Sequence, residues 1–167
     1  MSGKMKLGYV GVGLMGLPMA KRLLALGYCV RAFDIAPGQL AAAREAGAAA
    51  ASSAADTVQG ADLVLLNLPT PEAVEAAVFG ERGLASALRP PQLLIDFSTI
   101  KVVQCKAFAQ RLRVATGAGW IDAPVSGGPP ASGSGTLTVM AGGEAAEIER
   151  ARPLLADVAG RFTHMGP

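Results

Sequence analysis

The sequence predicts an α/β protein whose doubly wound, mostly parallel sheet carries helices on both faces. Short apolar runs alternate with helix-like stretches along the whole chain, and this alternation implies right-handed crossovers between parallel strands. The run DLVLLNLP (62–69) is apolar at successive positions, as expected of a strand buried on both faces. The chain has 167 residues, of which 51% are hydrophobic and 17% charged, which suits one packed domain over residues 1–167.

The individual elements follow from these patterns and from the residues that start and end them. Strands are expected at 6–10, 29–34, 48–51, 62–69, 92–99, 120–123, 135–143 and 161–164. Helices are expected at 15–26, 37–46, 71–78, 100–116 and 144–158. A brief helix is expected after Ser52 and Ser53, which are candidate N-caps, and Pro37 and Pro71 suit helix starts. The segment SGGPPASGSG (126–135) is interpreted as a loop within the domain, because strand signals flank it on both sides.

A G-x-G-x-x-G pattern joins the first expected strand to the first expected helix. Gly11 suits a tight turn, Gly13 would let a diphosphate approach bare backbone, and Gly16 would let the helix pack closely on the strand. The helix N-terminus adds unpaired N–H groups and partial positive charge. The alternative is a glycine-rich turn between core elements. The predicted dinucleotide-binding loop consists of Gly11, Val12, Gly13, Leu14, Met15 and Gly16.

Asp34 ends the second expected strand, about twenty residues beyond the glycine loop, where a ribose-binding acid is expected. A carboxylate there can accept both hydroxyls of an adenosine ribose and would repel a 2′-phosphate. The stretch DIAPGQ (34–39) contains no cation, so the sequence favours NAD over NADP as the cofactor. Residues 128–133 have P-loop spacing, but Ser134 stands where the lysine belongs, which excludes a P-loop. No tyrosine is followed four residues later by a lysine, which excludes a short-chain dehydrogenase dyad.

Two further phrases are more distinctive than the glycine loop. DAPVSGG (122–128) is followed seven residues later by GTLTVMAGG (135–143), and GVGLMGLPMA (11–20) precedes both. Together they resemble the β-hydroxyacid dehydrogenase family, which includes 3-hydroxyisobutyrate dehydrogenase and tartronate semialdehyde reductase. The resemblance covers essentially the whole chain and implies a Rossmann-type cofactor domain.

The resemblance also implies roles for individual residues. Leu68, Pro69 and Val74 would line the adenine and ribose side of the cofactor, and Thr99 would lie near the nicotinamide ribose. The substrate carboxylate would be held by Ser126, Gly127 and Gly128. Consecutive small residues at a turn expose N–H groups that bind anions, although an ordinary tight turn is the alternative for these three. Thr99 could instead cap a helix, and Asp122 is interpreted as a structural anchor for its loop.

The chain departs from the family in two respects. Pro129, Pro130, Ala131 and Ser132 stand where the family usually has a Gly-Ala pair and an acid, and the two prolines would stiffen the loop and remove two donors. The family's catalytic lysine follows the last strand of the cofactor domain, which would place it beyond Pro167. Lys101 and Lys106 are interpreted as solvated helix residues. We therefore expect no catalytic residue in this chain, no all-helical C-terminal domain, and little or no turnover by the chain alone.

The expected activity of the intact protein is hydride transfer between NAD and a small β-hydroxy acid or its semialdehyde, of the 3-hydroxyisobutyrate, tartronate or succinic semialdehyde type. Imine reductases and 6-phosphogluconate dehydrogenases share the general build but usually favour NADP. A second hypothesis is a non-catalytic redox sensor that binds a dinucleotide. The retained VSGG loop, which a sensor would not need, is evidence against it.

Composition limits the partners. The net charge is only +2, and no basic cluster has interleaved aromatic residues, so nucleic acid is not expected. Two cysteines and one histidine, without ligand spacing, predict no metal site and suit the reducing cytoplasm. No apolar run is long enough for a signal peptide or a membrane span. A small carboxylate-bearing substrate is expected, and a homo-oligomer formed through the helical domain.

Overall fold

The computed structural model describes residues 4–167, so residues 1–3 of the predicted domain lie outside the described part. The strands are β1 (Lys6–Val10), β2 (Cys29–Phe33), β3 (Ala49–Ala50), β4 (Leu63–Leu66), β5 (Leu93–Asp96), β6 (Gly119–Asp122), β7 (Val125–Ser126), β8 (Leu137–Gly142) and β9 (Ala159–Gly166). The helices are α1 (Gly16–Ala25), α2 (Pro37–Glu45), α3 (Ala54–Thr57), α4 (Pro71–Phe79), a 3₁₀ turn η1 (Leu84–Ser86), α5 (Val102–Thr116), α6 (Gly128–Ser134) and α7 (Ala145–Val158).

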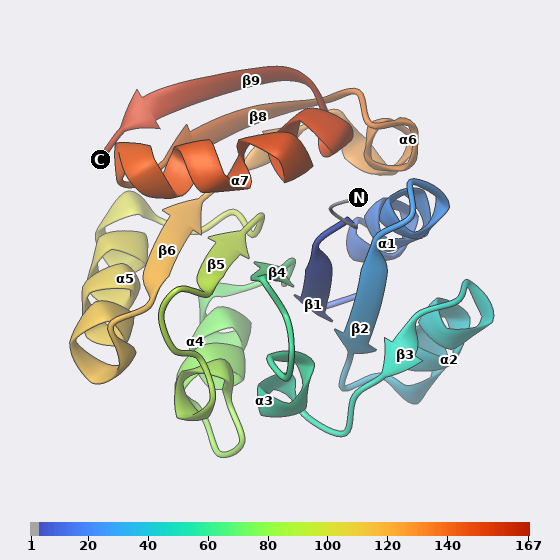
Figure 1. The fold of residues 1–167 in the computed structure, drawn as a ribbon, viewed down its shortest axis with the longest axis horizontal. Coiled ribbons are helices and arrows are strands. Elements are labelled where there is room, and N and C mark those ends of the chain that lie inside the picture. Colours follow the sequence, from blue (N-terminus) through green and yellow to red (C-terminus); the bar gives the residue numbers. More distant parts are fainter. Residues whose placement is uncertain (1–3) are drawn as a thin grey trace.

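The sheet has the order β3-β2-β1-β4-β5-β6-β8-β7, with β9 paired to β8 (Figure 1). Strands β1 to β6 are parallel, and β8 turns antiparallel to β6. The chain adds β2 and β3 on one side of β1, and then β4, β5 and β6 on the other. The point of reversal lies between β1 and β4, and ligands of open α/β sheets bind outside the carboxyl ends of the strands at such a point. The predicted fold class is confirmed.

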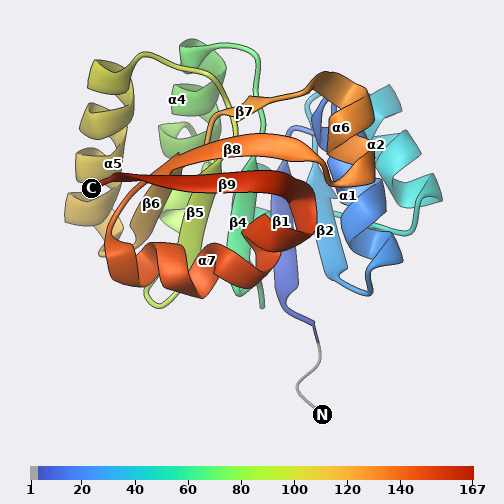
Figure 2. The same cartoon turned by 90° about the horizontal axis from the view of Figure 1, so that it is seen from above.

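Helices cover both faces of the sheet, as predicted. Figure 2 shows α4 and α5 on one side of the central strands and α7 on the other. One core cluster joins alternate residues of β1, such as Leu7 and Tyr9, to α1, α2 and α7. A second cluster joins the opposite faces of β1 and β4, such as Val10 and Val64, to α3, α4 and α5. The central strands are apolar on both faces because each face has its own core.

The expected starts of two early helices are confirmed. The Ser53 hydroxyl accepts a hydrogen bond from Asp56 N at 3.1 Å and caps the brief helix α3. At α4, Pro71 occupies the first turn, and the Thr70 hydroxyl accepts a hydrogen bond from Ala73 N at 3.1 Å. These caps fix the loops that leave β3 and β4 at the edge of the sheet where the glycine loop lies.

The carboxyl-terminal part contains two elements that were not predicted, the short strand β7 at Val125–Ser126 and a helix. Residues 126–135 do not form a loop throughout, because Gly128–Ser134 is the helix α6. Pro129 and Pro130 lie in its first turn, where a missing N–H removes no helical hydrogen bond, so the two prolines start a helix instead of stiffening a loop. Inside the molecule, the Ser132 hydroxyl donates to the carbonyl of Met15 at 2.8 Å and docks α6 on the start of α1.

The last expected strand is present but longer than predicted. β9 spans Ala159–Gly166 and pairs parallel to β8 with two register shifts. Helix α7 connects the two strands as a crossover along one edge of the sheet (Figure 1). Among residues 4–167, every helix is too short or too polar to cross a membrane.

Candidate dinucleotide-binding site

The glycine loop lies between β1 and α1 and leaves one position open. Gly11 has φ +88°, and a Cβ there would overlap the carbonyl of Asn67. A Cβ at Gly16 would overlap the carbonyl of Gly11, so the helix packs on the loop without room for a side chain. At Gly13, by contrast, no described atom lies within 4 Å of the Cβ position. The loop is tightly packed at its two ends and bare in its middle.

Some backbone N–H groups of the loop are hydrogen-bonded within the protein, and others are free. Val12 N donates to Asp34 Oδ2 at 2.9 Å, and Gly11 N donates to the carbonyl of Phe33 at 3.0 Å. Within residues 4–167, the N–H groups of Gly13, Leu14 and Met15 have no acceptor. They lie at the N-terminus of α1, where the helix dipole adds partial positive charge. This arrangement suits a diphosphate.

Asp34 is fixed at the carboxyl end of β2 by two backbone donors. Its Oδ2 accepts from Val12 N, and its Oδ1 accepts from Ala36 N at 2.8 Å. The side chain is half-buried. An ionised carboxylate has about four acceptor sites, so each oxygen keeps a lone pair for a further donor. The position and the free lone pairs fit the predicted contact with two ribose hydroxyls.

Two cavities meet at Leu68 and form a groove across the glycine loop. The first, of about 360 Å³, extends from Gly11 and Asp34 towards α3 and α4. The second, of about 540 Å³, extends along Gly13–Gly16 to the ends of β4 and β5 and reaches Gly128. Leu68 lines both cavities. Pro69 and Thr99 line the second cavity, together with Asn67, Phe97 and Ser98.

The comparisons with known proteins agree with this geometry. Residues 6–166 match the family model described as the NAD binding domain of 6-phosphogluconate dehydrogenase. The chain belongs to this family of NAD-binding domains. It is similar to an NAD-dependent L-serine dehydrogenase of Pseudomonas aeruginosa, with 39% identity over 97% of this chain and 54% of the relative. It is also similar to the 2-hydroxy-3-oxopropionate reductase of Escherichia coli, with 34% identity over 97% of this chain and 55% of the relative.

A solved relative has the same fold. The 3-hydroxyisobutyrate dehydrogenase of Mycobacterium tuberculosis, solved with L-serine, superposes with a TM-score of 0.91 at 37% identity. The match covers 97% of this chain and 54% of that chain. The resemblance to the β-hydroxyacid dehydrogenases is therefore confirmed. The chain spans about half the length of these relatives.

Two expectations within this NAD-binding domain need correction. Val74 is fully buried in the core beneath α4 and does not line the adenosine cavity, whereas its neighbour Ala73 does. The helix phase turns Val74 inward. The N-cap alternative for Thr99 is wrong, because α5 begins at Val102 after Lys101. Thr99 is an exposed residue at the second cavity, as its expected place near the nicotinamide ribose requires.

Three residues of the groove were not predicted. Asn67 lines the second cavity, and its buried side-chain amide lies beside the Tyr9 hydroxyl. Ser98 Oγ accepts from Leu68 N at 2.9 Å and ties together the loops after β4 and β5. Ile35 lines the first cavity and is 91% exposed. Their position directly after buried strands was the available signal, since the loops after parallel strands carry the ligand site.

The predicted substrate residues lie at the far end of the second cavity. Ser126 is exposed at the end of β7, and Gly127 and Gly128 have φ of +134° and +72°. Gly128 lines the cavity together with Val125. Of the three residues, Gly128 thus reaches the groove of the glycine loop, whereas Ser126 and Gly127 do not line it, so their role in substrate binding stays a prediction.

Two carboxyl groups, of the buried Asp96 and the half-buried Asp122, end the strands that lead into the loops beside the second cavity. Asp96 and Asp122 are register partners at the ends of β5 and β6. Burial raises the pKa of Asp96 to about 7, against the lowering effect of hydrogen bonds from Ser98. Burial also raises the pKa of Asp122, whose hydrogen bond with Cys105 acts in the opposite direction. Asp122 is half-buried and lines a separate cavity together with Cys105 and Lys106, so its interpretation as a structural anchor stays a prediction.

Proposed function

We propose that residues 1–167 form the cofactor domain of an NAD-dependent enzyme. Its reaction would be hydride transfer between the nicotinamide and a small β-hydroxy acid or semialdehyde, of the 3-hydroxyisobutyrate, tartronate or succinic semialdehyde type. The observation that carries the proposal is the groove over the glycine loop, which is bare only at Gly13 and continues past Asp34 on one side and Thr99 on the other. The names of the relatives, a serine dehydrogenase and a hydroxyoxopropionate reductase, support the substrate class.

The residues present fit the dinucleotide. The free N–H groups of Gly13, Leu14 and Met15 would hold the diphosphate, and Asp34 would accept the adenosine ribose hydroxyls. Asn67, which lines the second cavity, would supply an amide donor to the nicotinamide half. When bound, the nicotinamide supplies the hydride acceptor or donor, which no side chain can provide. The N–H groups of the Ser126–Gly128 turn would fix the substrate carboxylate.

The remaining parts of the reaction are assigned outside this chain. Proton transfer to or from the substrate hydroxyl would need the family lysine, which the resemblance places beyond Pro167. We also propose that the helical part of the longer protein forms its homo-oligomer, as the resemblance implies. A cytoplasmic location is supported by the two free cysteines, one of them exposed.

Cofactor choice tests the ribose role of Asp34. Calorimetric titration of Asp34→Ala should show NADH affinity reduced by about 10-fold or more, because charge-assisted hydrogen bonds are lost. NADPH should lose less, because the substitution also removes a repulsive charge. Asp62→Ala is the matched control, since Asp62 also accepts a backbone N–H, from Lys6 at 2.8 Å, but lies at the amino end of β4. Equal losses for NADH and NADPH would contradict the ribose role.

A turnover measurement tests whether the 167-residue chain alone can catalyse the reaction. The purified 167-residue chain should bind NADH but show little or no NADH-linked rate with small hydroxy acids or semialdehydes. A clear rate would show that the chain holds its own proton-transferring group.

A further inference from the structure

The adenosine cavity continues well beyond Asp34. If the diphosphate lies on Gly13 and the ribose on Asp34, the base must point to the outer end of the first cavity. That end is formed by Ile35, the alanines of α4 that face the cavity, the loop before α3, and Arg82. Ala73, Ala76 and Ala77 give this end a largely apolar lining, and Glu81 lines it next to Arg82.

Arg82 is held in an unusual conformation at this outer end. Its φ of +55° makes it the single non-glycine residue with a left-handed backbone in residues 4–167. Two contacts fix it: its carbonyl accepts from Ala55 N at 2.9 Å, and its Nη2 donates to Ser52 Oγ at 3.0 Å. Left-handed conformations of non-glycine residues carry strain, persist only when neighbours impose them, and cluster at functional sites.

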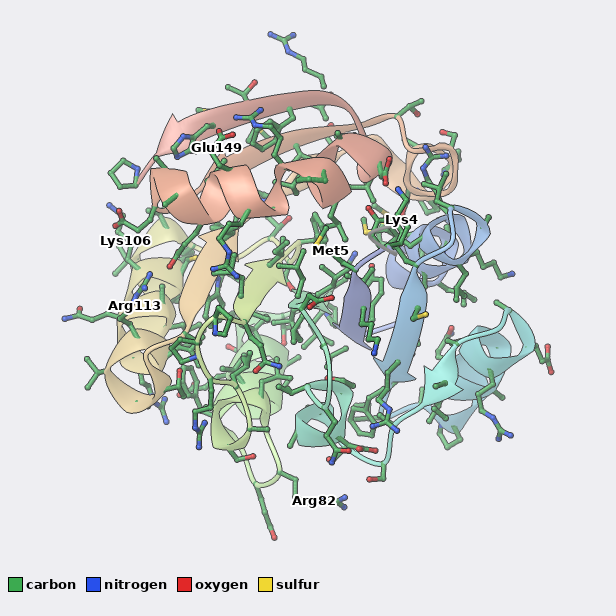
Figure 3. The ribbon with its side chains drawn as sticks, viewed as in Figure 1. Lys4, Met5, Arg82, Lys106, Arg113 and Glu149 are labelled. Atoms are coloured by element: carbon green, nitrogen blue, oxygen red, sulfur yellow. The ribbon has the colours of Figure 1, made fainter. Side chains whose placement is uncertain are left out.

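The guanidinium keeps most of its binding capacity free. Figure 3 shows Arg82 at the lower edge of the molecule, below α3. The residue is exposed, and in the described part of the chain no carboxylate oxygen lies within ion-pair distance of it. The nearby charge is that of Asp56, which hydrogen-bonds the same Ser52 hydroxyl. One amino group is anchored to Ser52, so the planar group is oriented by the protein while the rest of it faces cavity or solvent. An anchored, planar cation loses little further freedom when it stacks on a ligand.

Ile35 lies on the same cavity and is 91% exposed. An aliphatic side chain that large gains most when a flat apolar surface covers it. An adenine ring has two such faces, one suited to an aliphatic contact and the other to a guanidinium.

We propose that Arg82 and Ile35 clamp the adenine base, so that this chain recognises the base itself in addition to the diphosphate and the ribose. The inference rests on the proposed dinucleotide function and adds a residue from the turn after α4. Nothing in the G-x-G-x-x-G pattern or in the acid at position 34 indicates this contact.

The experiment measures the affinity of NADH, NADPH, AMP and nicotinamide mononucleotide by calorimetry for the wild type, Arg82→Gly and Arg82→Met. Glycine suits the left-handed backbone, so Arg82→Gly removes the side chain without adding strain. Methionine keeps an aliphatic stem without the charge. Arg89→Ala is the control, because Arg89 is an exposed arginine on the turn after η1 that bonds only local carbonyls.

We expect Arg82→Gly to weaken both NADH and AMP by about 5-fold, with nicotinamide mononucleotide unchanged. Arg82→Met should lose nearly as much, and Arg89→Ala nothing. Unchanged AMP affinity in Arg82→Gly, an equal loss for nicotinamide mononucleotide, or full affinity in Arg82→Met would overturn the clamp. A larger loss for NADPH than for NADH would show that Arg82 contacts a phosphate, which also overturns it. A wild-type chain that binds neither NADH nor AMP would overturn the proposed function together with the clamp.

Discussion

Two glycine-containing turns, residues 11–16 and 125–128, border the same cavity but are constrained differently. In the first, Gly11 and Gly16 have no room for a Cβ, and only Gly13 faces open space. In the second, Gly127 and Gly128 have positive φ, and Gly128 has almost free space around its Cβ position. Packing excludes a side chain at both ends of the first turn, where Gly11 also has a positive φ. In the second turn both glycines have a positive φ, and Gly127 is tightly packed as well.

In the first turn, the glycines needed for folding are different from the glycine that faces the binding groove. At Gly11 and Gly16 a side chain would meet other backbone, so their role is in the fold. At Gly13 a side chain would meet only what the groove holds. In the second turn no such division exists, because any L-residue is strained there whatever the space. Substitutions in the two turns should therefore behave differently, and they test the comparison directly.

The largest effect is expected at Gly16. Gly16→Ala places a methyl group against the carbonyl of Gly11 and forces α1 away from the loop. We expect the free energy of unfolding to fall by about 3 kcal/mol, as in overpacked cores. Chemical denaturation followed by circular dichroism measures this. A stability loss below about 1 kcal/mol would contradict the tight contact between helix and loop.

Gly13→Ala is the matched variant three residues earlier in the same loop. With no described atom within 4 Å of the new methyl group, stability should stay within about 0.5 kcal/mol of the wild type. NADH affinity should nevertheless fall by about 10-fold, because the methyl group occupies the place proposed for the diphosphate. If Gly13→Ala bound NADH as tightly as the wild type, the diphosphate would not lie at the position proposed for it.

The next prediction concerns the pH dependence of stability that arises at the ends of β5 and β6, the strands that lead to the two turns. Asp96 ends β5, next to the cavity of the first turn, and its register partner Asp122 ends β6, just before the second turn. The pKa of Asp96 is raised to about 7 by burial, well above the value of about 3.9 for an unfolded chain. Between these two values the unfolded state releases a proton that the folded state keeps. Stability contributed by Asp96 therefore falls as the pH rises from about 4 to about 7, by up to about 1.4 kcal/mol per pH unit.

Asp96→Asn removes this titration. Relative to the wild type, the free energy of unfolding of Asp96→Asn should increase as the pH rises from 4.5 to 7. Above pH 8 the difference between the two proteins should stay constant. Denaturation at a series of pH values measures the difference. In Asp122→Asn, the fall in stability caused by Asp96 should end at a lower pH than in the wild type, because the Asp122 charge helps to raise the pKa of Asp96. If the free energies of unfolding of Asp96→Asn and the wild type differed by the same amount at every pH, Asp96 would be solvated in the folded state.

The first turn and its sheet could be predicted from the sequence, and the second could be predicted only in part. Strands such as β4 are buried on both faces, so their apolar runs identify them without knowledge of their neighbours. Helix α6 was missed because GPPASGS has the composition of a loop. Its helical form depends on prolines in the first turn and on the hydrogen bond from Ser132 to Met15, which is 117 residues away in the sequence.

The candidate site shows the same limit. The glycines and Asp34 were identifiable because their spacing follows from local backbone requirements. Val74 was assigned to the adenosine pocket although α4 turns it into the core, and Ala73 lines the cavity instead. The phase of a short, largely apolar helix cannot be derived from apolar spacing alone, because residues on both of its sides are alanine or valine. Arg82 and Ser52 are thirty residues apart, and only the fold brings them together.

In the second turn, Gly127→Ala and Gly128→Ala form a pair, and both should cost less stability than Gly16→Ala. Gly128 has φ +72°, and only Pro130 Cδ, at 3.9 Å, lies near its Cβ position, so Gly128→Ala costs only the left-handed strain, about 1 kcal/mol. Gly127 has φ +134°, and its new methyl group would lie 2.7 Å from Ala131 Cβ, so Gly127→Ala should cost about 2 kcal/mol. Thermal or chemical denaturation ranks the two. If Gly128→Ala were the more damaging, the close contact between residue 127 and Ala131 would not determine the cost of a side chain in this turn, and the expected ranking would be wrong.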